Sequence, residues 1–508
     1  MTLLHSRFHK HFPVFFFLLF STLLYAQKNK KVELIHANAL TYDETAGGKV
    51  RHLTGDVKFR QDNIFLYCDS AFFYSETNAI DAFSNVRIVQ GDSLNLYGDV
   101  LKYDGNRKQA EMFRNIRMND GKITLTTDHI SYDMKLNIAS YSEGGKIIDG
   151  DNTLTSKTGY YYSSQKDFFF KKNVVLLNPD YKMTCDTLKY NGPSKVAYFL
   201  SPTFITSKEH LIYCENGWYD TEKGTSRFSK NAYLQSKEQK LKGDSILFDR
   251  ISGNGKAFGN IEITDTIERI VIRGDYAEYF QKHDSAMVTG HTLFIQIFET
   301  DSMYLHADTL TASGDSAGTS EKKQKRIMAY HHVKIFKPDL QGKCDSLAYS
   351  AKDSSMEMYK APILWSDKNQ LTAEHISMEL SRNRISKLLM LRSSFIISQE
   401  DSVHYNQVKG KKMTGHFENN KLHDMLVEGN GETIYYAKDN NNRFIGVNKA
   451  VCSDILILIH ENKVNDISLL KKPEAAFHPM GELGKEDLFL KGFTWRGDER
   501  PGSREDIF

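Results

Sequence analysis

The sequence predicts an all-β protein in which units of antiparallel strands are stacked into an elongated body. Two different sequence signals recur about every 29 residues over most of the 508 residues, which indicates one structural unit copied along an axis. Apolar and polar residues alternate within each unit, as in strands with one buried face. Aromatic residues make up 12% of the chain against only 9 prolines, a composition that suits long strands better than helices or disorder.

The first 26 residues have the features of a secretory signal peptide. Arg7 and Lys10 precede an apolar run over residues 14–24, and Ala26 supplies a small residue at the cleavage point. The apolar run is too short to span a bilayer comfortably. We therefore expect an exported chain that begins near Gln27 and is either soluble or peripheral.

The first repeated signal is an Asn, an Asp or a small residue that leads into a strand of alternating apolar residues. Its spacing stays close to 29 residues, apart from one gap of two units. It occurs at Asp56-Val57, Asn85-Val86, Asn115-Ile116, Gly145-Lys146-Ile147, Asn173-Val174, Asn231-Ala232 and Asn260-Ile261.

The second signal is a residue, usually Asp, with an aromatic residue four positions later. The apolar alternation shifts by one residue at the acid, so we expect a bulge or corner there, with the charge pointing outward. A corner residue that bonds its own turn amides explains this column better than a calcium site or a catalytic carboxylate pair, because the acids are spread evenly along the chain. The signal occurs at Asp69…Phe73, Asp99…Tyr103, Asp128…Tyr132, Thr158…Tyr162, Asp186…Tyr190, Glu215…Tyr219, Asp244…Phe248 and Asp275…Tyr279, with further matches at Asp308, Asp345…Tyr349 and Glu374…Met378.

The repeats divide the chain into segments. We predict strand repeats over residues 27–312, a mobile polar loop over 313–326, further repeats over 327–465, and a tail over 466–508 that does not follow the repeat. The tail is expected either to cap the stack or to dock a partner.

The inward-facing residues of the repeats are the candidate functional residues. They form a continuous apolar lining, which is a simple core if the two flanks of each unit close tightly and a groove for acyl chains if the flanks stand apart. The candidates are Leu66, Phe73, Leu96, Leu101, Tyr103, Leu125, Ile130, Tyr132, Leu188, Tyr190, Ile246 and Phe248.

The sequence offers no motif for catalysis, a cofactor or a metal. His331 and His332 are adjacent, and neighbours in a strand point to opposite faces, so we expect no shared metal. Four of the five cysteines share a small-residue position in the repeat; buried thiols are favoured there, although Cys185 and Cys214 could lie on neighbouring units and oxidise. A formal net charge of +2 provides no field to attract nucleic acid.

Several motifs in phase resemble the OstA-like (LptA-type) family of lipopolysaccharide transport. They are Leu53-Thr54-Gly55-Asp56-Val57, Ala82-Phe83-Ser84-Asn85-Val86-Arg87-Ile88, its echo at residues 257–263, and the Gly-Asp-x-Leu-x-Tyr type motifs at 98–103 and 243–248. The resemblance covers roughly residues 35–460. It departs from the family pattern at the polar loop and the tail.

The resemblance implies a twisted, open β-jelly roll, or β-taco, without enzymatic activity. It implies an interior that binds the acyl chains of lipid A. It also implies a periplasmic location, either free or peripheral to the outer membrane. Related jelly-roll domains of the inner-membrane and outer-membrane components would join its ends by edge-strand pairing. Two alternatives stay open at this point: a structural or adhesive β-solenoid with a closed core, and a polysaccharide-acting β-helix enzyme, which the even spread of carboxylates disfavours.

Overall fold

A computed structural model describes residues 31–43, 50–91, 94–121, 123–314, 325–350, 353–381, 384–418, 421–460 and 463–508. The predicted signal peptide and most of the predicted polar loop lie outside these ranges. The described residues form 36 strands, each antiparallel to its partners, and four 3₁₀ helices of three or four residues. The prediction of an all-β, antiparallel fold is confirmed.

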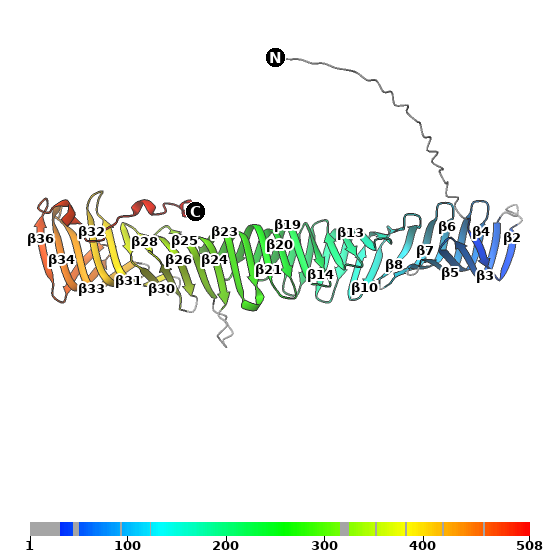
Figure 1. Ribbon diagram of the computed structural model, residues 1–508, viewed down its shortest axis with the longest axis horizontal. Coiled ribbons are helices and arrows are strands. Elements are labelled where there is room, and N and C mark those ends of the chain that lie inside the picture. Colours follow the sequence, from blue (N-terminus) through cyan, green and yellow to red (C-terminus); the bar gives the residue numbers. More distant parts are fainter. Residues whose placement is uncertain are drawn as a thin grey trace, which may run out of the picture. The chain divides into compact units, whose positions relative to one another are not determined.

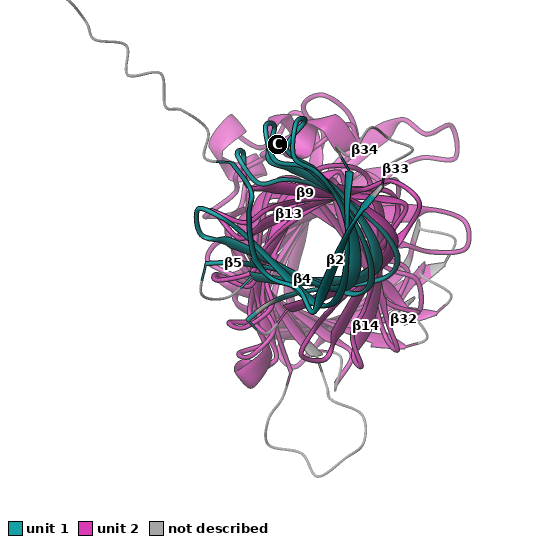
Figure 2. Ribbon diagram, turned by 90° about the vertical axis from the view of Figure 1, so that its right-hand side faces the viewer, with its two compact units in different colours: residues 1–121, 131–136 teal, residues 122–130, 137–508 magenta. Residues whose placement is uncertain are grey.

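The chain divides into two compact units, coloured separately in Figure 2. Unit 1 contains residues 1–121 and 131–136, and unit 2 contains residues 122–130 and 137–508, so that β8 contributes to both. The strands of unit 1 are β1 (Glu33–His36), β2 (Ala39–Asp43), β3 (Val50–Gln61), β4 (Ile64–Tyr74), β5 (Ala79–Gln90), β6 (Leu94–Asp104), β7 (Gln109–Asp120) and the end of β8 (Ile123–Asp133).

Unit 2 continues the same architecture, with its strands side by side in sequence order (Figure 1). Its strands are the start of β8, then β9 (Ile138–Tyr141), β10 (Gly145–Asp149), β11 (Asn152–Ser156), β12 (Thr158–Tyr162), β13 (Asp167–Leu177), β14 (Tyr181–Asn191), β15 (Val196–Phe199), β16 (Thr203–Ser207), β17 (Leu211–Cys214), β18 (Asn216–Asp220), β19 (Thr225–Gln235), β20 (Gln239–Asp249), β21 (Gly255–Asp265), β22 (Ile270–Phe280), β23 (Ser285–Ile297), β24 (Ser302–Gly314), β25 (Lys325–Lys337), β26 (Leu340–Ser350), β27 (Ser355–Tyr359), β28 (Ile363–Ser366), β29 (Asn369–Thr372), β30 (His375–Ser381), β31 (Arg384–Gln399), β32 (Tyr405–Glu418), β33 (Lys421–Lys438), β34 (Phe444–His460), β35 (Lys463–Leu470) and β36 (Glu474–Pro479). Its 3₁₀ helices are η1 (Gln281–His283), η2 (Lys485–Leu488), η3 (Gly497–Glu499) and η4 (Arg504–Ile507).

Most strands bend near their middle, so that one strand contributes to two facing sheets. In β5 the register shifts between Phe83 and Val86, where two residues of β5 lie opposite one residue of β6. Such a one-residue bulge bends the strand locally. The halves of β3 and β4 over residues 50–54 and 70–74 belong to what we call sheet A, and their halves over 57–61 and 64–68 belong to sheet B.

The two bulged residues explain the first repeated signal. Ser84 and Asn85 have φ angles of 62° and 51°, and Gly259 and Asn260 have φ angles of 67° and 46°, so both residues of each bend are left-handed. Glycine adopts this conformation without steric cost, and Asn tolerates it better than most residues. The Asn or Gly-Asn signature therefore marks a backbone requirement at the bend.

The turns opposite the bends are closed by local hydrogen bonds. Asp104 Oδ1 accepts from the backbone N–H groups of Asn106 and Arg107, at 2.9 and 3.0 Å. Asp249, which follows Phe248, makes the same pair of bonds with Ile251 and Ser252 in unit 2. Because an Asx turn of this kind needs an Asp or Asn at the strand end, it explains the acidic residue that follows many of the aromatic anchors.

The ladder of bent strands extends beyond residue 465, the predicted end of the repeats. β35 and β36 pair with the two halves of β34 and are separated by the left-handed residues Lys471 and Lys472. They form one more bent strand, and only the segment after Pro479 departs from the repeat.

Candidate functional site

The apolar rows of sheets A and B face each other across a shared interior. In unit 1 the rings of Phe59 on sheet B and Phe73 on sheet A lie 5.5 Å apart. In unit 2 Tyr181 on sheet B and Tyr219 on sheet A make a similar contact at 5.7 Å. The period-two alternation of each strand therefore directs one apolar row from each sheet into the same space.

The sequence-predicted lining residues belong to these inward rows, in both units. Eleven of the twelve are buried, with no more than 6% of any side chain exposed, and Phe248 is half-buried. Unit 1 holds Leu66, Phe73, Leu96, Leu101, Tyr103 and Tyr132, and unit 2 holds Leu125, Ile130, Leu188, Tyr190, Ile246 and Phe248.

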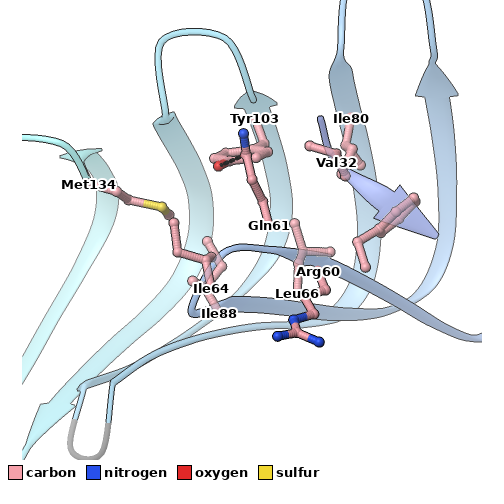
Figure 3. Close-up of a pocket in the computed structure, with 10 residues that line it drawn as sticks. Val32, Arg60, Gln61, Ile64, Leu66, Ile80, Ile88, Tyr103 and Met134 are labelled. Atoms are coloured by element: carbon pink, nitrogen blue, oxygen red, sulfur yellow. Dashed lines mark hydrogen bonds between the residues drawn. The ribbon is translucent and has the colours of Figure 1, made fainter. Parts of the chain in front are cut away.

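One cavity in the interior of unit 1 is too small for an acyl chain. The cavity in Figure 3 has a volume of about 10 Å³, the space of roughly one water molecule. Its lining includes Ile64 and Leu66 from sheet B and Ile80 and Tyr103 from sheet A. An acyl chain can enter here only if the two sheets separate.

Polar contacts join the two sheets on the side opposite the bends, which we call the mouth. In unit 1 the Tyr103 hydroxyl donates to Gln61 Oε1 at 2.5 Å, and Lys108 forms a 2.6 Å ion pair with Asp62. In unit 2 the carboxylate of Asp149 accepts from the Tyr190 hydroxyl at 2.7 Å and from Lys195 Nζ at 2.6 Å. These contacts close the mouth over β3–β6 and β10–β15.

Burial perturbs the tyrosines of these mouth contacts. Desolvation raises the pKa of Tyr103 well above its ordinary value, and nearby Asp62 adds to the shift. Desolvation also raises the pKa of Tyr190, and its hydrogen bond to Asp149 adds to that effect. Both hydroxyls are therefore held as neutral hydrogen-bond donors.

The inward row of unit 2 is more exposed in one stretch of strands, which we call the window. The difference is seen in the column of aromatic residues four positions after the acidic anchors. The column is buried at Phe73, Tyr103, Tyr132, Tyr190 and Tyr219, and half-buried at Tyr162. It is half-buried at Phe248, 41% exposed at Tyr279 and half-buried at Tyr349, and it is buried again at Met378. This row is therefore most accessible to solvent from β20 to β26.

Other apolar side chains gather at this window. Ile270, Ile272, Met303 and Ile327 are half-buried and pack against the interior cluster of unit 2. Ile251 and Ile267, at the tips of two turns, are 77% and 67% exposed. Sequence reasoning did not select these residues; an isoleucine at the tip of a polar turn is the signal that could have pointed to them.

The acidic anchors lie at the bends, as expected, but their partners differ from the prediction. Asp69 accepts from Asn85 Nδ2 at 2.7 Å, and Asp244 accepts from Asn260 Nδ2 at 2.9 Å. The carboxylate is bonded to the bulged Asn of the next strand and not to its own turn amides. The two repeated signals thus meet in space. The described residues contain no group of three or more His, Cys, Asp or Glu that could hold a metal ion.

His331 and His332 occupy a bend and contact different strands. His331 pairs with Asp345 of β26 at 3.3 Å, and His332 pairs with Asp308 of β24 at 2.8 Å. The two imidazoles therefore serve as bend residues in the place of Asn.

All five cysteines are free, and four of them are buried. Burial raises the pKa of the Cys185 and Cys214 thiols to about 12. Both residues are in register with Thr203 of β16, which lies between their strands. Two strand spacings put their Cα atoms roughly 9.5 Å apart, too far for a disulfide, so the alternative of oxidation is wrong in this register.

Two protein-family models match this chain. Residues 29–186 match the model of the OstA-like protein family, and residues 271–384 match that of the LptA/(LptD N-terminal domain) LPS transport proteins. The chain belongs to the OstA-like family of lipopolysaccharide-transport proteins. The second match covers Tyr279, Met303 and Ile327, so the window lies in the part that resembles LptA and the N-terminal domain of LptD. A search of curated proteins found no match.

The helices in the described ranges are single turns, and none has the length or apolar character that a membrane crossing requires.

Proposed function

We propose that this OstA-like protein is a non-enzymatic, periplasmic carrier that shelters the acyl chains of lipopolysaccharide between sheets A and B. The observation that carries the proposal is the window in unit 2, where Tyr279 is 41% exposed although the equivalent Tyr103 and Tyr190 are buried. Each acyl CH₂ removed from water contributes about 0.8 kcal/mol, so an apolar trough with a solvent opening is suited to such a ligand.

The closed parts of the interior set the order of events in this proposal. An acyl chain first contacts Ile270, Ile272 and Met303, whose side chains are already partly accessible. Movement along the interior then requires the mouth contacts, such as Tyr190 with Asp149, to open. The twelve sequence-predicted residues become lipid contacts only in that opened state.

The ends of the ladder supply the means of bridging the membranes. β1 and β2 pair with β3, and β35 and β36 pair with β34, so each end presents a strand with one edge available within the described ranges. We propose that related jelly-roll domains of the inner-membrane and outer-membrane components add strands to these edges. The signal-like sequence at residues 1–26 supports export to the periplasm.

Site-specific photocrosslinking tests the proposal. p-Benzoylphenylalanine in place of Tyr279 should form adducts with lipopolysaccharide, whereas the same probe in place of Lys230, an exposed bend residue far from the mouth side of its strand, should not. Adducts at Tyr132 as well would show that the closed part opens. No adduct at Tyr279, with the folded protein and lipopolysaccharide both present, would favour the closed-core scaffold.

A further inference from the structure

The segment after β36 lies across the outer face of sheet B in unit 2. This segment, residues 480–508, is the part of the predicted tail that follows β36, and the word tail refers to it from here on. It runs back over the strands in reverse order (Figure 1). Near its start, the Asp487 carbonyl accepts from Lys449 of β34 at 2.8 Å. At its end, the Phe508 main-chain oxygen accepts from Lys334 of β25 at 3.1 Å. The tail thus spans the strands from β34 to β25.

Two glutamines hold the tail through its main chain. Gln407 Nε2 donates to the Leu488 carbonyl, and the Leu490 N–H donates to Gln407 Oε1, both at 2.8 Å. Gln370 repeats this double bond with residues 494 and 496 of the tail, at 2.8 and 2.7 Å. Each glutamine amide therefore satisfies a carbonyl and an N–H two residues apart, as a neighbouring strand would.

The face beneath the tail is apolar. Trp365, Ile397 and Ile434 alternate with the two glutamines in one row across the strands, and each is at most 1% exposed. Their chain neighbours Leu364 and Ile396 belong to the interior cluster, so this row points to the outer face. Leu488 and Leu490 of the tail pack near Ile434. Without a tail, this row would be exposed to water.

The connection between β36 and the tail is one tight turn. The Glu482 N–H donates to the Pro479 carbonyl at 3.2 Å, and Gly481 has a φ angle of 89°. Residues 480–482 are exposed. β36 pairs with β34 on one side, and none of the described strands pairs with its other edge. A short exposed hinge beside an unpaired edge strand is the geometry from which domain swapping arises.

We propose that two copies of this chain exchange tails, each tail lying on sheet B of the other copy. The exchanged tail keeps every contact described above, because the second copy presents the same glutamines and the same apolar row. The hinge then extends without its turn, and the two β36 edges come together and gain strand pairing. A second copy and a related jelly-roll domain therefore exclude each other at this edge. The partner for this surface is therefore a second copy of this chain.

Tethering sets the balance between the two states. The tail of the same chain competes with the tail of a second copy for the outer face of sheet B. Its effective concentration there is high, roughly millimolar for a short flexible link, so the closed monomer is favoured in dilute solution. Pairing at β36 shifts the balance toward the dimer. The dimer fraction should therefore rise with protein concentration and with any change that prevents the turn at Gly481.

The substitution Gly481→Pro tests this inference. Proline fixes φ near −65°, which the turn at Gly481 cannot accommodate. We expect the dimer association constant, measured by size-exclusion chromatography with light scattering, to rise at least tenfold. Gly484→Ala is the matched control, because Gly484 has a φ angle of −66° and an added Cβ lies 3.5 Å from the nearest atom, so it should behave as the unmodified chain.

Crosslinking identifies the exchanged segment. Two differently tagged copies are unfolded and refolded together, one of them with p-benzoylphenylalanine in place of Phe493, whose ring lies 5.4 Å from Tyr405. Exchange predicts adducts between the probe in one copy and the Tyr405 region of the other. Crosslinks confined to single chains, or a monomeric Gly481→Pro variant with a protease-sensitive tail, would overturn the proposal. Lipid binding at Tyr279 is read separately, because that residue lies on sheet A.

Discussion

Asn85 donates a hydrogen bond from Nδ2 to Asp69 Oδ2 over 2.7 Å, which joins the bends of two successive strands. Asn115 and Asp99 repeat the contact at 2.6 Å, as do Asn260 and Asp244 at 2.9 Å in unit 2. At later bends His291 and His332 take the place of Asn. The contact is exposed, so its contribution to stability is small, and the left-handed backbone beneath it is the stronger constraint.

The left-handed backbone at the bends predicts that alanine substitutions at two glycines on paired strands differ in their effect on stability. Gly259→Ala should destabilise unit 2 by about 1–2 kcal/mol, because φ is 67° and the new Cβ would lie 2.3 Å from Asp244 Oδ2. Gly243→Ala is the control, since its Cβ would meet no atom closer than 3.6 Å. Thermal unfolding followed by circular dichroism measures both, and equal melting temperatures would contradict the explanation.

The converse change should stabilise unit 1. Arg114 has a φ angle of 69°, which costs a side-chain-bearing residue about 1–2 kcal/mol. Arg114→Gly should recover roughly 0.5–1 kcal/mol after the greater flexibility of glycine in the unfolded chain is subtracted. Arg114→Ala keeps the left-handed strain and should gain nothing. A denaturant series on the three proteins distinguishes backbone relief from loss of the charge.

A charge at the window should separate binding from folding. Tyr279→Asp should lower the affinity for a fluorescent acyl probe at least tenfold and change the melting temperature little, because Tyr279 is 41% exposed. Leu101→Asp places a charge at a fully buried position and should unfold unit 1. If Tyr279→Asp binds the probe as well as the unmodified chain does, the window is not the entry site.

The mouth contact of Tyr190 predicts a loss of stability at alkaline pH. Its pKa is raised by burial and by Asp149, so the neutral phenol is favoured in the folded state. That stabilisation is complete below the unfolded-state value of about 10 and is lost as the pH rises above it. Tyr190→Phe should therefore show a shallower fall in melting temperature between pH 9 and 11, at the cost of about 1 kcal/mol near pH 7. Tyr160→Phe, which removes an exposed phenol, should keep the original slope.

The cysteines should be unreactive until the protein unfolds. Burial raises the pKa of Cys68, Cys214 and Cys344 to about 12, so little thiolate is present at neutral pH. A thiol reagent at pH 8 should label the native chain slowly and all five thiols rapidly in denaturant. A non-reducing peptide map that contained a Cys185–Cys214 disulfide would contradict the register of β14, β16 and β17.

The sequence was sufficient to predict the strands and the bends, because both depend on local signals. Alternation identifies a strand, and Asn or Gly-Asn identifies a left-handed bend. The contact between Asn85 and Asp69 was not predicted, because it depends on the register between strands. Whether the interior is open depends on side chains that meet across it: Tyr103 and Tyr279 follow the same motif, yet one is buried and the other exposed. The docking of the tail could not be predicted either, because hydrogen bonds between glutamine side chains and the main chain of the tail leave no periodic pattern in the sequence.

The burial of Ile507 bears on when one surface of the molecule can be completed. The 3₁₀ helix that carries it contacts β24 and β25, near the far end of the path of the tail from β36. Synthesis proceeds from the N-terminus, so Trp365 and Ile397 stay uncovered until residues 488–496 have been made. This face is therefore completed only after all the strands beneath it have been made, and a chain cut before residue 488 leaves it exposed.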